Sequence, residues 1–171
     1  MADVYLDPAG QGWMMSAIAP VYRGDFLEGV VGIDVTVDGI LSEINGLPVP
    51  WDGYAMLISS DMNIMAMPPK AEQDFGLQEL TSHTYQEAIR REIFKPADFN
   101  LAQRTETAGL AEVLQARDQG VEQLKLNDRA LLVGWERVEQ TGWRLLTVVD
   151  ERLCSPRPTR WPKSIAASVC G

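Results

Sequence analysis

Residues that could carry out catalytic chemistry are few in this sequence. His83 is the sole histidine, and it lies in residues 80–84, a stretch typical of a loop before a helix. A Ser-His-Asp or Cys-His catalytic set would therefore have to use it. Thr84 and Glu87 have the spacing of a capping box, so helix capping already explains this segment. We predict no catalytic residues and no enzymatic activity.

Metal and cofactor chemistry is equally poorly supported by the sequence. The acidic pairs Asp150-Glu151 and Glu136/Glu139 have no Gly-rich loop, Asp-x-Asp run or histidine beside them, so they are interpreted as surface charge. Cys154 and Cys170 both lie in the last eighteen residues and cannot hold the body of the chain together. We expect no metal site, no cofactor and a fold stabilised by its hydrophobic core.

The charge and hydropathy patterns exclude two classes of partner. A formal net charge of -9 disfavours binding to the phosphate backbone of nucleic acids. No window approaches the roughly 20 apolar residues of a membrane-spanning helix, and the first residues lack the pattern of a signal peptide. The chain as given is therefore expected to be soluble and without a targeting segment.

The first part of the sequence predicts a hairpin followed by a helix. Two apolar, partly β-branched segments flank the polar turn at residues 23–25, which predicts a β-hairpin over residues 12–36. Val37, Ile40, Leu41 and Ile44 then recur at helical spacing, with Gly46 as the expected C-cap.

The remainder predicts an α+β domain. Strands are expected over residues 53–59 and 63–67, and the helical pattern of residues 71–120 is divided at Pro96. Three further strands are expected over residues 121–126, 130–138 and 143–149, joined by turns at Asn127-Asp128 and Thr141-Gly142. Two strands, then helices, then a three-stranded antiparallel meander is the element order of a PAS-like domain.

Methionine and aromatic residues of these strands offer one candidate pocket. They could line the sheet face under the helices and bind a small apolar ligand, or they could simply form the core that a domain of this size needs. Both interpretations stay open for the set Tyr54, Met56, Met65, Met67, Trp135 and Trp143.

Several motifs, which occur in the same order along the chain, resemble those of double Cache sensors, which are PAS-like receptor domains. Trp13 begins a strand that runs into Pro20-Val21-Tyr22, a Gly24-Asp25 turn and residues 29–34, Gly-Val-Val-Gly-Ile-Asp. These resemble the end of the membrane-distal half. Residues 53–58 and 141–146 resemble the first strand and the start of the last strand of the membrane-proximal half.

The resemblance implies a domain organisation and a class of function. Residues 1–46 would be the end of a truncated distal half, residues 47–151 the proximal PAS-like domain, and residues 152–171 a weakly ordered Pro-rich tail in place of a helical exit. It implies an extracytoplasmic (periplasmic) sensing module of a membrane-anchored bacterial receptor that drives a kinase, cyclase or chemotaxis output. The expected partners are a small-molecule ligand and a second copy in a homodimer.

The resemblance also implies a ligand site in the distal half. Amine- and amino-acid-binding members use an aromatic residue before the tryptophan-bearing strand and an acid after it, which match Tyr5 and Asp34, with Trp13 on the strand itself. The expected ligands are amino acids, amines or small carboxylates. Alternatively, Asp34 caps the following helix and Tyr5 lies on a loose N-terminal segment. A ligand-free dimerisation module is the alternative function, since the edges of the hairpin could pair with a partner strand.

Overall fold

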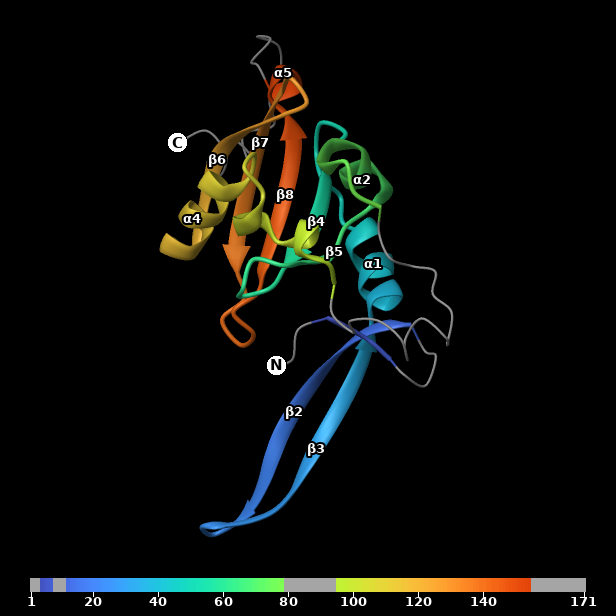
Figure 1. Cartoon of the computed structure of the whole chain (residues 1–171), viewed down its shortest axis with the longest axis vertical. Helices are drawn as coiled ribbons and strands as arrows, with labels where there is room; N and C mark the ends of the chain where they lie inside the picture. The colour runs from blue at the N-terminus through green and yellow to red at the C-terminus, as the bar shows by residue number, and fades with distance from the viewer. Residues whose placement is uncertain (1–3, 8–11, 79–94, 155–171) are drawn as a thin grey trace.

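Two antiparallel sheets form the framework of the protein (Figure 1). The structure is a computed structural model that describes residues 4–7, 12–78 and 95–154. The first sheet has the order β1-β2-β3, with β1 at Tyr5–Leu6, β2 at Trp13–Arg23 and β3 at Phe26–Thr36. The second has the order β5-β4-β8-β7-β6, with β4 at Tyr54–Ile58, β5 at Ile64–Ala66, β6 at Gln119–Leu126, β7 at Arg129–Arg137 and β8 at Arg144–Asp150.

Strands β2 and β3 form a long hairpin that projects away from the five-stranded sheet (Figure 1). The predicted hairpin is confirmed, and its turn uses Gly24 with a φ of 60°, a conformation that glycine adopts without strain. Apolar side chains far from the hairpin base are exposed to solvent: Ile18, Tyr22, Phe26, Val30, Val31 and Ile33. An exposed apolar surface of this kind is typical of an interaction site.

Helix α1 (Val37–Asn45) connects the hairpin to the second sheet and confirms the predicted helix. Thr36 is its N-cap, because its side chain accepts a hydrogen bond from the backbone N–H of Gly39. Gly46 is the C-cap, as expected. The apolar positions spaced along the helix bury one face, consisting of Val37, Leu41 and Ile44.

The five-stranded sheet has the element order predicted for a PAS-like domain, which confirms the α+β fold class. Asn127 and Asp128 join β6 to β7 with φ values of 49° and 59°. Two consecutive positive φ values are those of a type I′ turn, whose twist matches that of a hairpin. The predicted turn at Thr141-Gly142 likewise joins β7 to β8, with a φ of 72° at Gly142.

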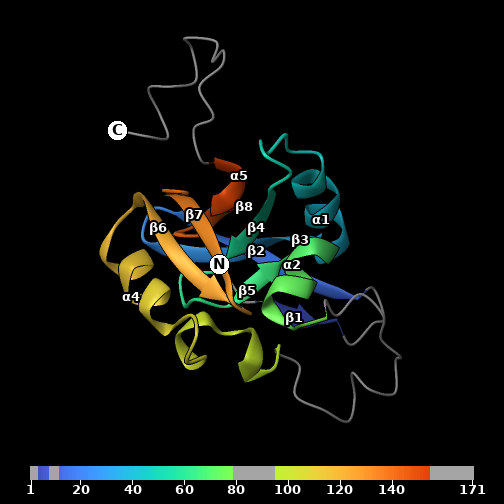
Figure 2. The same cartoon turned by 90° about the horizontal axis from the view of Figure 1, so that it is seen from above.

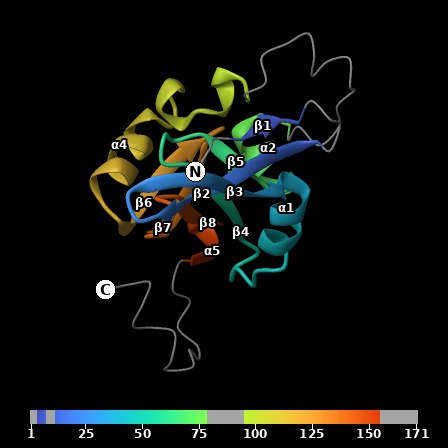
Figure 3. The same cartoon turned by 90° about the horizontal axis from the view of Figure 1, so that it is seen from below.

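Helices α2 (Pro69–Phe75) and α4 (Ala108–Ala116) pack on one face of this sheet, together with short 3-10 helices at Ala97–Phe99 and Leu101–Gln103. Leu101 lies in a 3-10 helix, within the region of residues 71–120 whose pattern predicts regular helix. Figures 2 and 3 show α4 and α1 on opposite sides of the molecule, with β6 nearer α4. Residues 79–94 of the predicted helical region, which include the capping box and His83, lie outside the described residues, as does the predicted tail after Cys154.

The sheet separates two hydrophobic clusters. The helix-face cluster contains side chains of α2 and α4 together with Tyr54, Met56, Ile58, Met67, Leu131, Val133, Trp135, Leu146 and Val148. The second, which we call the α1 cluster, lies on the other face and joins α1 to the hairpin base through Val4, Met15, Ala55, Leu57, Met65 and Ala66. The base of the hairpin is thus fixed to the sheet by packing.

Gly53 gives a direct test of how closely the segment before β4 approaches the sheet. A Cβ atom there would lie 2.5 Å from Val149 Cγ1 and 2.7 Å from the Val148 carbonyl oxygen. Gly53→Ala is therefore expected to lower the free energy of unfolding by about 1–3 kcal/mol in urea denaturation. Gly109→Ala is the matched control, since no atom lies within 4 Å of its added Cβ. Equal stability of both variants would contradict this packing.

Candidate functional site

Tyr5, Ser16 and Asp34 form a hydrogen-bonded chain across the three strands of the first sheet. Ser16 and Asp34 are directly paired residues of β2 and β3, and Tyr5 lies on β1 opposite Met14. The Ser16 hydroxyl donates to Asp34 Oδ1 over 2.5 Å, and Tyr5 Oη lies 2.7 Å from Ser16 Oγ. Because the Ser16 hydrogen is used on Asp34, the Tyr5 hydroxyl is the donor to Ser16.

This geometry excludes the structural alternatives for Tyr5 and Asp34. The α1 N-cap is Thr36 and not Asp34. Tyr5 belongs to a paired strand and not to a loose segment. The two residues that the resemblance to double Cache sensors matched to a ligand site are therefore brought together, through a serine that sequence analysis did not single out.

Trp13 is not part of this group. Side chains of successive strand residues point to opposite faces, so Ser16 shares a face with Met14 and not with Trp13 or Met15. Trp13 packs against the α1 cluster, as Met15 does. Trp13 thus packs the hairpin base, and its role as a ligand contact stays a prediction.

The hydrogen-bonded chain of Tyr5, Ser16 and Asp34 is suited to binding a positively charged group. Asp34 is exposed, and among the described residues Ser16 is the one donor to its carboxylate, which leaves Oδ2 available to a ligand. A ligand ammonium there would gain charge-assisted hydrogen bonds, and the adjacent Tyr5 ring could add a cation-π contact. Both Tyr5 and Ser16 are half-buried, which limits their freedom.

The second predicted pocket is divided by the sheet. Tyr54, Met56, Met67 and Trp135 lie in the helix-face cluster, whereas Met65 belongs to the α1 cluster and Trp143 packs against it. The six residues therefore cannot line one pocket under the helices. Met56, Met65 and Met67 are at most 1% exposed, which agrees with the interpretation of these residues as core.

A polar network that sequence analysis missed lies at the end of the sheet near α5 (Glu151–Cys154). Arg129 bridges the carboxylates of Asp74, on α2, and Asp150, at the end of β8. Tyr54 Oη donates to Asp74 Oδ2 over 3.0 Å. Asp150 is also bound by Arg152, over 2.7 Å. Asp150 was interpreted as surface charge, and this is wrong, because its side chain is only 9% exposed.

Hydrogen bonds set the protonation behaviour of this network. Arg152 donates to Asp150 through side chain and backbone, and with a further bond from Arg129 it holds the pKa of Asp150 well below its usual range despite burial. The pKa of Tyr54 is raised, first by burial and then by the negative charge of Asp74, so Tyr54 stays protonated and donates. Asp150 is therefore ionised at neutral pH, and the network links α2 to the start of α5.

The described residues contain no group of three or more His, Cys, Asp or Glu side chains that could hold a metal ion. None of the helices described is long and apolar enough to span a membrane.

Comparisons with known proteins place this geometry in context. No family model matches the sequence. The methyl-accepting chemotaxis protein PctB of Pseudomonas aeruginosa is 31% identical over 70 residues, which are 41% of this chain and 11% of PctB. Among solved structures, the ligand-binding domain of PctB in complex with L-Arg matches with a TM-score of 0.58 and 19% identity, covering 92% of this chain and 56% of that domain.

Two further solved structures give the same result. The ligand-binding domain of the Pseudomonas fluorescens chemoreceptor CtaA, in complex with L-leucine, has a TM-score of 0.56 at 18% identity and covers 90% of this chain and 54% of that domain. The extracellular domain of mmHK1S-Z2, assigned as a histidine kinase, has a TM-score of 0.61 at 16% identity. The match covers 89% of this chain and 50% of that domain. These are Cache-type sensor domains. This chain has the Cache fold. It spans about half the length of the solved Cache domains that it matches.

Replacing Arg129 tests whether the polar network supports the Cache fold. Arg129→Met leaves the buried Asp74 carboxylate without its charged partner, so the free energy of unfolding is expected to fall by about 2 kcal/mol in urea denaturation. Arg137→Met is the matched control, because the Arg137–Asp118 pair is 3.4 Å long and 77% of the Asp118 side chain is exposed. The control should change stability by about 0.5 kcal/mol or less. Equal losses in both variants would contradict a specific role of Arg129.

The depressed pKa of Asp150 predicts a pH dependence of stability. A carboxylate with a lower pKa in the folded state contributes stability above its unfolded pKa of about 3.9, and this contribution is lost as the pH falls toward the folded pKa. The stability difference between the wild type and Asp150→Asn should therefore be largest at pH 6 and smaller at pH 3, measured by urea denaturation. A difference that is the same at both pH values would refute the ionised network. Asp118→Asn, at an exposed carboxylate, serves as the control.

Proposed function

We propose that this chain is part of an extracytoplasmic sensor that binds a small organic ligand and has no catalytic role. The observation that carries the proposal is the Tyr5–Ser16–Asp34 chain, which presents a carboxylate beside an aromatic ring on a Cache fold. A carboxylate held in place by one neighbour and open to another is suited to binding rather than to turnover. In the described residues, no group of three or more His, Cys, Asp or Glu side chains that could hold a catalytic metal lies beside it.

The proposed ligand is an amino acid or a related amine. Solved domains with this fold were determined with L-Arg, L-Gln and L-leucine, which share an α-ammonium group while their side chains differ. Asp34 would accept from that ammonium group. An exposed pair of this kind contributes little by itself, so further walls are needed for tight binding.

The domain organisation supplies those walls in the proposal. Residues 1–46 would be the end of a membrane-distal half, residues 47–151 the membrane-proximal half and residues 152–171 the segment that follows. Exposed apolar side chains along β2 and β3 support this division, because they are suited to packing against further sheet and helix residues. The remainder of a distal half would cover the hairpin and enclose Asp34.

In the intact receptor, the module would lie outside the cytoplasmic membrane and transmit ligand binding to a kinase, cyclase or chemotaxis output. PctB is a chemotaxis protein and mmHK1S-Z2 is assigned as a histidine kinase, so both kinds of output occur with this fold. Transmission through a homodimer would require ligand binding to change the packing of two subunits.

A ligand-free packing or dimerisation module is the second candidate function. The specific observation that favours it is the exposure of Phe26 and Ile33, at 72% and 65% on the edge strand β3. An uncovered edge strand with exposed apolar residues can pair with another chain. This candidate differs from the first in requiring no ligand at Asp34.

The ligand proposal is tested by calorimetry and thermal unfolding with single L-amino acids, amines and small carboxylates at millimolar concentration. A ligand at ten times its Kd should raise the stability of the wild type by about 1.4 kcal/mol. Asp34→Asn removes the charge that pairs with the ammonium, so it should weaken binding about threefold to fivefold, as expected for an exposed ion pair.

Asp25→Asn is the matched control, because Asp25 is an exposed acid at the tip of the same hairpin. It should bind ligand as the wild type does. An equal loss of affinity in both variants would show that the effect comes from the overall negative charge and not from Asp34. Absence of any response in the wild type, together with concentration-dependent self-association, would favour the packing module instead.

A further inference from the structure

The outer face of the five-stranded sheet is only partly covered. The α1 cluster packs over β4 and β5 on this face. Beyond it, a cavity of about 190 Å³ lies over β6, β7 and β8, and the segment between α1 and β4 forms its wall. We call it the outer-face cavity. It lies on the side of the sheet opposite the helix-face cluster and is distinct from the Tyr5–Ser16–Asp34 chain.

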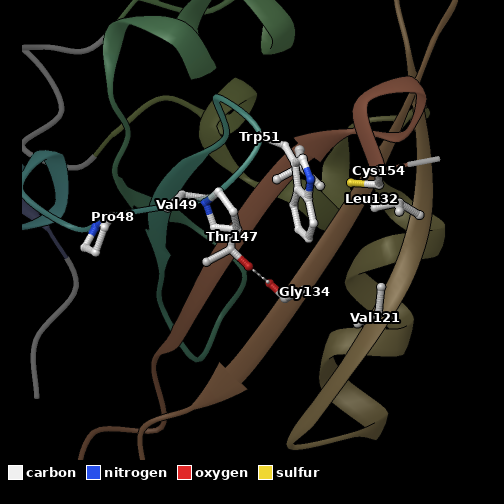
Figure 4. Close-up of a pocket in the computed structure, with 10 residues that line it drawn as sticks. Pro48, Val49, Trp51, Val121, Leu132, Gly134, Thr147 and Cys154 are labelled. Atoms are coloured by element: carbon white, nitrogen blue, oxygen red, sulfur yellow. Dashed lines mark hydrogen bonds between the residues drawn. The ribbon is translucent and has the colours of Figure 1, made fainter. Parts of the chain in front are cut away.

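The lining of the outer-face cavity is apolar. Val121, Leu132 and Val149 contribute from three strands, and Trp51 contributes an indole from the connecting segment. Figure 4 shows the Trp51 ring beside the Cys154 sulfur, above the strand that carries Leu132. The Thr147 hydroxyl donates to the Gly134 carbonyl oxygen over 3.4 Å, so it is already used within the sheet. Among the described residues that line the cavity, no side chain carries a charge.

The wall that carries Trp51 is held in a defined position. Trp51 and the following Asp52 have φ values of 54° and 55°, a left-handed conformation that few non-glycine residues adopt. Such a conformation persists where the surrounding structure determines it. The close approach of Gly53 to Val148 and Val149 then fixes this segment against the sheet. The indole is therefore held over the cavity by its backbone.

The size and lining of the cavity limit what it can hold. Its volume of about 190 Å³ is below the roughly 300 Å³ of drug-sized ligand sites and above the roughly 150 Å³ of a cavity that accepts benzene. A helix or strand would require a longer groove. We propose that the outer-face cavity is a second ligand site, which takes a small apolar molecule of one or two rings.

A ligand in this site would contact segments at both ends of the domain that contains the five-stranded sheet. Trp51 belongs to the segment that follows α1 and hence the hairpin. Cys154 belongs to α5, whose first residues adjoin the Asp150–Arg152 ion pair. A ring inserted between these walls contacts the entry to the domain and its final described helix together. The site can therefore modulate the relation between them.

Indole is a suitable probe, with glycerol as the polar control. In a Cys170→Ser background, alkylation of Cys154 by N-ethylmaleimide reports on access to the cavity. Indole at about ten times its Kd should slow this reaction about tenfold, because about nine-tenths of the cavities are then filled. Melting temperature should rise over the same concentration range.

Gly134→Val fills the cavity, since a Cβ there would lie 3.1 Å from Thr147 Oγ1 and 3.9 Å from Val121 Cγ2. It should abolish the effect of indole on both readouts. Gly29→Val is the matched control, because Gly29 is also a strand glycine and has no atom within 4 Å of an added Cβ. Val121→Trp, at a side chain that is 48% exposed, provides an independent block if Gly134→Val folds poorly.

Saturable protection in the wild type and Gly29→Val, lost in the filled variants, supports the site. Protection that is absent from the wild type, or unchanged in the filled variants, overturns it. Sedimentation of the same proteins distinguishes a macromolecular occupant: self-association that is lost in the filled variants would also overturn the small-molecule assignment. These outcomes are independent of Asp34, so they do not depend on the proposed hairpin site.

Discussion

Strand β4 is buried on both of its faces, and the rest of the structure depends on this constraint. Tyr54, Met56 and Ile58 pack into the helix-face cluster, while Ala55 and Leu57 pack into the α1 cluster. All five side chains are buried, so neither cover can be removed without exposing a central strand to water. The helices, α1 and the hairpin base are thus held around one strand.

This arrangement decides where chemistry can occur. The helix face of the sheet is filled by aliphatic, methionine and aromatic side chains, so the candidate sites lie elsewhere. Packing of Val4 and Met15 fixes the hairpin base, and the strand alternation then turns Tyr5 and Ser16 to the opposite face, beside Asp34. The outer-face cavity exists because α1 covers only part of that face of the sheet.

Local patterns were sufficient to predict much of the fold. The apolar segments around Gly24, the helical spacing after Thr36 and the Asn127-Asp128 turn each carry their own signal, and the structure agrees with all three.

Contacts between distant residues carry no such signal. Arg129 and Asp74 are 55 residues apart, so their ion pair could not be deduced from sequence. The placement of Met65 and Trp143 on the outer face depends on strand register, which the composition of these strands does not encode. At the hairpin, resemblance to known sensors indicated Tyr5 and Asp34, but Ser16 between them required the register of β2 against β3.

We propose that the ligand binds at the base of the hairpin. Amide chemical shifts of the ¹⁵N-labelled chain, recorded during titration with a mixture of the proteinogenic L-amino acids, report on this contact residue by residue. We expect saturable shift changes concentrated at Tyr5, Ser16 and Asp34. Changes confined to β6, β7 and β8, or no saturable change anywhere, would contradict it.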